Sequence, residues 1–248
     1  MSIKENRQFM KSDFAESVHQ ISDQAKKVPY PPLQKELPEA DLQLIDLPEP
    51  DPGILIKAEF NQLLRDRQSW RKYTKDPLSL DELSFLLFST QGLLAEVGQG
   101  YASRRTVPSA GARHPFETYL AVNRVSGLEP GIYLYRPFGH QLAFLEGSEN
   151  LPDLLTNANL GQKFVGNSAC TFVWSCVPYR AEWRYMEHAH KNMLLDAGHI
   201  CQNLYLAVEA LGLGTCAVGA YDQAAMDALF ELDGEDEYVV YLAPVGKI

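Results

Sequence analysis

The longest helical pattern in the chain covers roughly residues 182–211 and stops at Gly212 and Gly214. Apolar side chains recur along it at helical spacing, and they form a broad face made of Met193, Leu194, Ala197, Ile200, Cys201, Leu204, Val208 and Leu211. A single face of a sheet does not need a stripe of this width. The pattern therefore predicts a long helix at the centre of the molecule, buried on more than one side.

The length and charge of the chain exclude several classes of protein. Its 248 residues, 46% of them hydrophobic, suffice for one full-sized domain or for one domain with an extension. The formal net charge of −10 makes the surface repel a phosphate backbone, so we expect no nucleic-acid partner. No run of about 18 apolar residues occurs, and the N-terminus lacks the apolar core of a signal peptide, so we expect no membrane segment.

The four cysteines, Cys170, Cys176, Cys201 and Cys216, lie in apolar runs without CxxC or CxxH spacing. This arrangement favours buried thiols in a reducing cytoplasm over disulfides or zinc. We therefore expect a cytoplasmic protein with no metal site.

Helical and strand patterns alternate irregularly after Gly53. Strands are expected at 117–125, 131–136, 140–145, 170–177 and 237–246, and helices at 54–69, 79–94, 182–211 and 223–231. Ser79 with Glu82 three residues later is a capping-box pattern that predicts the start of one of these helices. Since the order is not a strict βαβ alternation, the fold class is α+β, with a mostly antiparallel central sheet flanked by helices.

Residues 1–56 differ from the remainder, 57–248. The stretch 28–53 contains seven prolines, and proline fixes φ and removes a hydrogen-bond donor. The segment is therefore expected to be an extended, proline-rich N-terminal arm. It either wraps over the domain or is a disordered tail, and its apolar residues favour wrapping: Leu42, Leu44, Ile45 and Leu47.

A basic run, "RDRQSWRKYTK" at 65–75, contains five of the 22 lysines and arginines of an otherwise acidic chain. Arg67, Ser69 and Arg71 alternate, so extended structure would place all three side chains on one face. Two guanidinium groups beside a hydroxyl suit a phosphate, because arginine binds phosphate oxygens bidentately. The alternative is a solvated charge run that follows a helix.

Two loops rich in small residues accompany the basic run. They are "RTVPSAGARHP" at 105–115 and "LGLGTCAVGAYD" at 211–222. Small residues let a planar ligand lie against the backbone. Together with the basic run, these loops indicate an anionic, planar ligand.

Several longer motifs, in order along 58–248, resemble the nitroreductase family of FMN-dependent flavoproteins, and most closely its SagB-type (thiazole/oxazole oxidase-like) dehydrogenase branch. They are "RQSWRKYTKDPLSLDELSFLL", "PSAGARHPFETYL", "GLEPGIYLYRP", "EWRY", "DAGHICQNLYLAVEALGLGTCAVGAYD" and "VGK". The resemblance implies a nitroreductase-like flavin-binding domain at 57–248 and a homodimer that shares two FMN sites. The long helix would lie at the centre of that dimer.

The resemblance also implies roles for residues of the subunit that holds the flavin. Arg67, Gln68 and Ser69 match phosphate and ribityl contacts, and Arg71 matches a basic residue at the pyrimidine edge. Gln162 is close to a position that faces the pyrimidine ring. The loop whose backbone N–H groups would lie at flavin N5 and O4 consists of Ala217, Val218, Gly219 and Ala220.

The second motif matches a segment that reaches the flavin from the partner subunit. Its matching residues are Pro108, Ser109 and Ala110, with Gly111, Arg113 and His114 beside them. Small residues here would allow close approach, and Arg113 and His114 would be polar groups aimed at cofactor or substrate. Lys247 is a further possible phosphate partner.

In the azole-forming branch, a Lys-Tyr pair is thought to remove the proton while a peptide azoline loses two hydrogens to FMN. The aligned pair here is Arg184-Tyr185, and arginine cannot lose its proton near neutral pH, whereas Tyr185 could act. Three functions therefore stay open. They are azoline-to-azole oxidation of a peptide beside a peptide-modifying partner enzyme, NAD(P)H-dependent reduction of nitro compounds or quinones, and a non-catalytic flavin-binding subunit of a peptide-modifying complex. Tyr185 could also be an ordinary helix-surface tyrosine.

Overall fold

A computed structural model of the chain describes residues 2–12, 20–39 and 41–248. Residues 1, 13–19 and 40 of the expected arm lie outside this description. The centre is a seven-stranded sheet in the order β1-β6-β5-β4-β7-β9-β8. Its strands are β1 (Leu44–Asp46), β4 (Phe116–Val122), β5 (Gly131–Arg136), β6 (Gln141–Gly147), β7 (Cys170–Cys176), β8 (Leu213–Thr215) and β9 (Tyr238–Lys247). Neighbouring strands of this sheet run antiparallel, which confirms the predicted α+β class.

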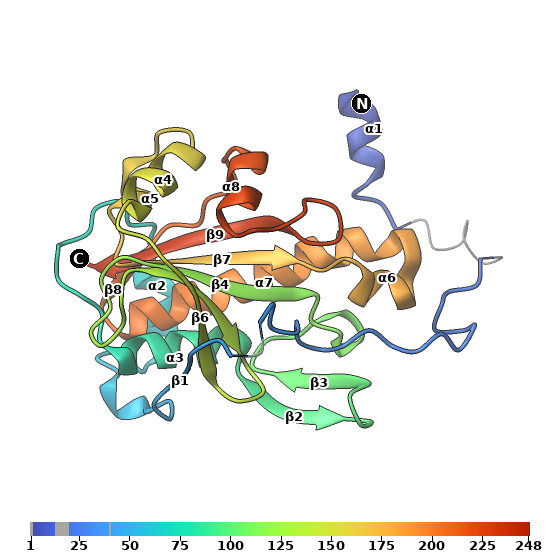
Figure 1. Cartoon of the computed structure of the whole chain (residues 1–248), viewed down its shortest axis with the longest axis horizontal. Helices are drawn as coiled ribbons and strands as arrows, with labels where there is room; N and C mark the ends of the chain where they lie inside the picture. The colour runs from blue at the N-terminus through green and yellow to red at the C-terminus, as the bar shows by residue number, and fades with distance from the viewer. Residues whose placement is uncertain (1, 13–19, 40) are drawn as a thin grey trace.

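Helices cover both faces of the sheet (Figure 1). One face carries α3 (Leu80–Gln91) and α7 (Ala189–Ala210), and the other carries α4 (Leu151–Ala158), α5 (Lys163–Gly166) and α8 (Gln223–Leu229). Strand β4 shows how one strand serves both layers. Leu120 and Val122 pack with the α3–α7 layer, whereas Tyr119 and Ala121 pack with the opposite layer. The whole of β4 is therefore buried.

The capping-box prediction at α3 is confirmed. The Glu82 N–H donates to Ser79 Oγ at 3.1 Å, and the Ser79 N–H donates to Glu82 Oε2 at 2.8 Å. The helix predicted at 54–69 is shorter, since only α2 (Phe60–Asp66) forms, after a 3₁₀ turn η1 (Pro52–Ile54). The N–H groups of Ile56 and Lys57 both donate to the Ala210 carbonyl at the end of α7, and this long-range contact draws the segment out of a helix.

The prediction of a single helix at 182–211 is wrong. The segment forms α6 (Tyr179–Tyr185), a 3₁₀ turn η3 (Met186–His188) and then α7. The chain breaks at Met186, whose φ of 50° and ψ of −135° are incompatible with an α-helix. Arg184 and Tyr185 therefore lie at the end of a short helix next to the break.

Several short elements lack a strong sequence pattern and were not predicted. They are α1 (Ile3–Gln8), η2 (Ala110–Ala112), α4, α5, β1, β8 and a separate hairpin of β2 (Leu93–Val97) and β3 (Ala102–Arg105). None of the helices in the described part of the chain combines the length and apolar character needed to cross a membrane.

The described part of the arm lies against the domain and supplies carbonyl groups to its arginines. Arg105 donates to the Leu33 carbonyl at 2.9 Å, and Arg136 donates to the Lys35 carbonyl at 3.0 Å. At its end the arm adds β1 to the edge of the sheet beside β6. The arm is thus part of the folded molecule and sets the surroundings of the arginines.

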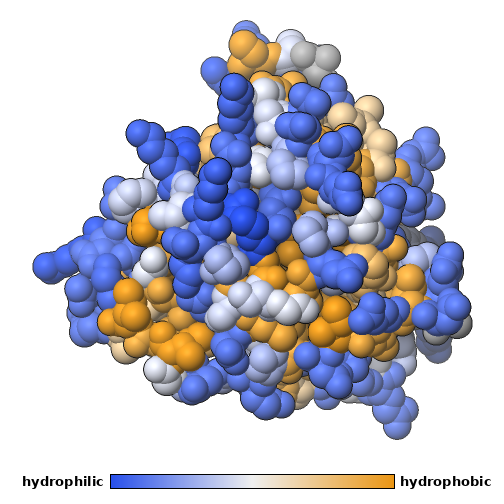
Figure 2. Space-filling view, turned by 60° about the vertical axis from the view of Figure 1, so that its left-hand side comes forward, coloured by the Kyte–Doolittle hydropathy of each residue, from blue (hydrophilic) through white to orange (hydrophobic). Residues whose placement is uncertain are grey.

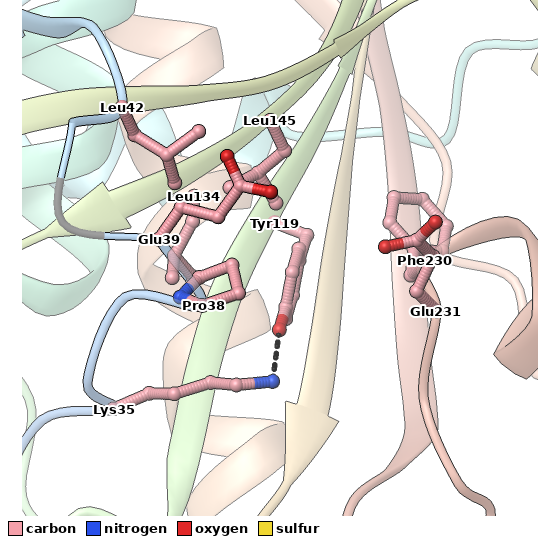
Figure 3. A pocket seen from close by; sticks show the side chains of 9 residues that line it. All are labelled: Lys35, Pro38, Glu39, Leu42, Tyr119, Leu134, Leu145, Phe230 and Glu231. Atoms are coloured by element: carbon pink, nitrogen blue, oxygen red, sulfur yellow. Dashed lines mark hydrogen bonds between the residues drawn. The ribbon is translucent and has the colours of Figure 1, made fainter.

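A pocket of about 180 Å³ lies where the arm crosses the sheet (Figure 3). Lys35 spans its lower side, with Nζ 2.9 Å from the Tyr119 hydroxyl and 2.5 Å from Glu237. Its apolar lining includes Leu42 of the arm and Phe230 after α8. Because the only ammonium that lines this pocket is already paired, we assign the pocket to arm packing.

Candidate active site

Tyr205 of α7 joins two of the three predicted ligand-binding stretches. Its hydroxyl lies 3.0 Å from Ser69 Oγ and accepts the Ala217 N–H at 2.9 Å. The guanidinium carbon of Arg67 lies 5.3 Å from the centroid of the Tyr205 ring, within cation–π range. The basic run and the 217–220 loop therefore meet within one chain.

The 217–220 loop carries two backbone donors without a partner in the described part of the chain, the N–H groups of Gly219 and Ala220. The other two are used internally, because Ala217 donates to Tyr205 and Val218 pairs with Leu242. Gln162 donates to the Ala220 carbonyl at 2.7 Å and so holds the loop from the other side. Both free amides belong to exposed residues and can reach a bound group.

The remaining members of this cluster lie at its margin. The Arg71 guanidinium is 5.9 Å from the ring centroid of Phe164, two residues after Gln162. Gln68 instead lines a cavity of about 360 Å³ beside Trp70. Arg67, Gln68, Ser69, Arg71, Gln162, Tyr205 and Ala217–Ala220 are hereafter the arginine-side cluster. Lys247, the further possible phosphate partner, is paired with Glu82 at 2.5 Å.

The third stretch is held at a different place by Asp196 of α7. Ser109 Oγ donates to Asp196 Oδ2 at 2.6 Å, and the Ala110 N–H donates to both carboxylate oxygens at 3.2 and 3.3 Å. Burial raises the pKa of Asp196, while its bonds to Ser109 and Ala110 oppose that rise. One carboxylate thus fixes the turn that the sequence identified.

Gly111 in this turn is in direct contact with Arg184 and Tyr185. A Cβ at Gly111 would lie 2.9 Å from the Tyr185 hydroxyl and 3.2 Å from Arg184 Cδ, and its φ of +63° also favours glycine. The residues assigned to the partner-facing motif and to catalysis therefore share one site. We call Pro108–Gly111, Arg184 and Tyr185 the turn cluster.

Arg113 and His114 do not face a ligand in this structure. The Arg113 side chain is 0% exposed and donates to the carbonyls of Arg180 (3.1 Å), Pro31 (2.7 Å) and Tyr101. His114 is buried too, with Nε2 at 3.0 Å from the Ser103 carbonyl. Desolvation and the nearby Arg105 lower the pKa of His114 to about 3, so it is neutral. Both residues hold the arm and hairpin together, and the expectation that they point at cofactor or substrate is wrong for this arrangement.

The two clusters are separated by α7. Asp196 and Tyr205 are nine positions apart (205 − 196), which corresponds to about 14 Å along a helix axis and to opposite sides of the helix. Each chain therefore presents two separate clusters, one on either side of α7.

Exposed apolar side chains occur on α7 and on α2 beside it. On the solvent-exposed side of α7, the exposed fraction is 51% for Leu194 and 53% for Leu195. A separate groove of about 370 Å³ is lined by residues of α2, α3 and α7, with Phe60 exposed at its edge. Figure 2 shows hydrophobic surface gathered over the lower part of one face, beneath a more hydrophilic upper part.

The match to known families decides the identity of the fold. The nitroreductase family model matches residues 64–247, which is well over half of the chain and includes both clusters. The chain belongs to the nitroreductase family. It is therefore an oxidoreductase-type domain, in agreement with the resemblance in its motifs.

Individual nitroreductase-like proteins cover the chain to different extents. A candidate nitroreductase of Methanocaldococcus jannaschii, MJ1384, is 34% identical over 207 residues, which are 84% of this chain and 96% of that protein. The trifolitoxin-processing protein TfxB of Rhizobium leguminosarum bv. trifolii is 31% identical over 163 residues, 63% of this chain but only 44% of TfxB.

A solved structure supplies a third likeness. A chain of the Escherichia coli microcin synthetase McbBCD complex, determined with truncated pro-MccB17 bound, has a TM-score of 0.62. The match covers 100% of this chain and 98% of that chain at 17% identity, so it shows a shared fold. Together with TfxB it is consistent with the predicted SagB-type branch.

Sequence reasoning missed two residues that organise this nitroreductase site, Asp196 and Tyr205. Both occur within the long apolar pattern of α7, where polar groups were not singled out as ligands. Their signal was present, since a carboxylate and a phenol in a buried stripe need hydrogen-bond partners. Those partners are the two loops that the ligand would touch.

Proposed function

We propose that the protein is a homodimeric FMN-dependent oxidoreductase that transfers hydride between flavin N5 and an organic substrate. The observation that carries the proposal is the separation of the two clusters across α7. A two-fold axis beside the exposed leucines of α7 would bring the arginine-side cluster of one chain to the turn cluster of its partner. The buried free thiols of all four cysteines agree with a cytoplasmic location.

The donors of the arginine-side cluster suit FMN. Arg67 and Ser69 offer a guanidinium and a hydroxyl for a phosphate and its ribityl chain. The free N–H groups of Gly219 and Ala220 suit polar atoms on a ring edge, and a Cβ at Gly219 would meet only Tyr241, at 3.9 Å. A planar group can therefore approach this backbone closely.

Bound FMN would supply the hydride chemistry, and the chain would position the reactants. Arg71 would stabilise negative charge near the pyrimidine edge of the ring. Tyr185, whose hydroxyl lies against Gly111, would carry a proton to or from the substrate. The guanidinium of Arg184 would contribute through its positive charge and its N–H donors.

Two substrate reactions have support. The names of the trifolitoxin-processing protein TfxB and of the microcin synthetase complex favour a peptide substrate and a peptide-modifying partner enzyme. Azoline-to-azole oxidation, the reaction that the resemblance to the SagB-type branch implies, acts on such a peptide. Arg184 in place of a lysine favours the alternative, NAD(P)H-dependent reduction of a nitro compound or quinone, because that reaction needs no lysine base.

The test begins with the visible spectrum of the purified protein, followed by anaerobic titration with NADH and with NADPH. A yellow dimer supports the proposal, and rapid bleaching by either nucleotide selects the reductase reaction. A yellow protein that both nucleotides leave unchanged selects an oxidase that is reduced by its own substrate. A colourless monomer that takes up no added FMN would contradict the proposal.

A further inference from the structure

The turn cluster extends to a tyrosine that neither the motifs nor the proposed reaction uses. Arg184 Nη1 donates to the Tyr101 hydroxyl at 2.9 Å, and Gln24 Nε2 of the arm donates to the same oxygen at 2.7 Å. A phenol oxygen has two acceptor positions and one proton to donate. Because two donors occupy the acceptor positions, the proton of Tyr101 is left to point at a third group.

Tyr101 is fixed in place by an aromatic cluster that includes the arm. Its ring lies 6.0 Å from that of Tyr30 and 6.0 Å from that of Trp183, both in edge-on geometry. Trp183 Nε1 donates to the Val28 carbonyl at 3.0 Å, and the Gln24 N–H donates to the Trp183 carbonyl at 2.9 Å. Residues of the arm therefore hold Tyr101 beside Arg184 before any ligand arrives.

Arg184 has no carboxylate partner in the described part of the chain. The nearest acidic neighbour in sequence, Glu182, is taken by His190 at 2.7 Å. Only Nη1 of the guanidinium has a hydrogen-bond partner among the described residues, and Nε lies 3.4 Å from the Cβ position of Gly111. A half-buried guanidinium with free donors, next to a phenol set as a donor, matches a planar group with two oxygens.

We propose that Arg184 and Tyr101 form a carboxylate-binding pair, so that the substrate is an organic acid or a peptide with a carboxylate near its reacting atoms. The inference rests on the proposed function, since it puts the bound group beside the flavin of the partner subunit. Arg184 binds the carboxylate through its remaining donors, and Tyr101 donates its hydroxyl proton. Gln24 is a positioning residue that turns that proton outward.

The experiment is isothermal titration calorimetry of the 248-residue chain, as purified and after incubation with FMN. The probes are benzoate and its neutral isostere benzamide. A second pair, a tripeptide with a free C-terminal carboxylate and its amide, separates a peptide terminus from a small acid. The variants are Arg184→Gln, Arg184→Lys and Tyr101→Phe. Tyr179→Phe is the matched control, because Tyr179 lies on α6 with Arg184 but its hydroxyl donates to Asp23 of the arm.

Wild-type protein and the Tyr179→Phe variant should bind the acid of one probe pair, benzoate or the tripeptide with a free carboxylate, more tightly than the corresponding amide. Arg184→Gln should lower the affinity for that acid by about tenfold or more, and Tyr101→Phe should lower it by about threefold to tenfold. The affinity for the amide should not change. Arg184→Lys should fall between wild type and Arg184→Gln, since it keeps the charge and loses the fork.

Equal affinities for acid and amide, or an affinity for acid that survives Arg184→Gln, would overturn the inference. A yellow, reducible protein with that result would leave the proposed function standing. Arg184-dependent binding of the acid by a protein that takes up no FMN would support the carboxylate pair and overturn the proposed function.

Discussion

The Tyr185 hydroxyl lies 2.9 Å from the point that a Cβ at Gly111 would occupy. The loop of small residues and the end of α6 are thus in contact with no room between them. This contact connects the motif expected at the partner's flavin to the residues expected to handle the proton.

Gly111→Ala should therefore impair the proposed reaction more than flavin binding. The new methyl group displaces Tyr185 or Arg184, and the φ of +63° adds about 1–2 kcal/mol of backbone strain. A misplacement of about 1 Å lowers turnover by up to about a hundredfold. Steady-state kinetics should show this loss at unchanged flavin content. Full activity would show that Tyr185 is not needed at that position.

Arg67→Ala should strip the flavin. Loss of a charge-assisted contact to the phosphate lowers the affinity for FMN by about tenfold to a hundredfold. The matched control is Arg65→Ala, because Arg65 is an exposed residue of α2 two positions away. Fluorescence titration of each apoprotein with FMN measures the difference. Equal affinities would remove Arg67 from the site.

Leu194→Asp should dissociate the proposed dimer. Leu194 is an exposed apolar residue of α7, and a two-fold interface would bury the new carboxylate twice. The dissociation constant should rise by at least about a hundredfold, so that sedimentation gives the 27.8 kDa monomer. Leu154→Asp, on α4 across the sheet, should leave the oligomeric state unchanged. Identical behaviour of the two variants would argue against α7 as the interface.

His114 should make the folded state sensitive to acid. Its pKa is lowered from 6.5 to about 3, so the unfolded chain binds a proton at a higher pH than the folded protein does. The contribution of a neutral His114 is complete above about pH 6.5 and is lost as the pH falls towards about 3.

His114→Asn isolates this effect, because asparagine tolerates the positive φ at that position. Between pH 7.5 and pH 4.5 the wild type should lose about 2–3 kcal/mol more unfolding free energy than the variant. Urea unfolding at both pH values measures the difference. The carboxylates, Asp196 included, titrate in both proteins and cancel. Parallel losses would show that His114 is not held neutral.

The parts of the fold that could be predicted from sequence are those with local causes. Alternating side chains predict β4, β5, β6 and β7, and the Ser79–Glu82 capping box predicts the start of α3. These signals depend on residues a few positions apart, and neighbours elsewhere in the chain do not alter them.

The helix break at Met186 is associated with contacts to residues far away in the sequence, and helical periodicity does not reveal such contacts. In α6, Arg180 pairs with the buried Glu117 of β4, and the Arg180 carbonyl accepts from Arg113. These contacts hold α6 away from the line of α7. A helical pattern that continues through 182–211 shows none of them.

The sequence indicated which loops make up the candidate site, but it did not indicate the role of each residue in them. Arg67, Ser69 and the 217–220 loop do meet, but the group that joins them, Tyr205, is one of many side chains in a buried stripe. Arg113 was assigned to the ligand because it lies beside Pro108–Ala110, the segment that resembles the flavin-facing motif of the family. Its actual partners include the Pro31 carbonyl of the arm, and only the folded position of the arm reveals them.

The central claim is that each flavin lies between two chains, and mixed dimers test it most directly. One chain carries Arg67→Ala in the arginine-side cluster, and the other carries Ala110→Trp, whose bulk fills the turn cluster. Each homodimer should bind FMN too weakly to retain it through purification. In the purified heterodimer one site combines both defects, whereas the other combines two intact halves, so we predict one FMN per heterodimer. A heterodimer with no FMN would contradict a site shared between subunits.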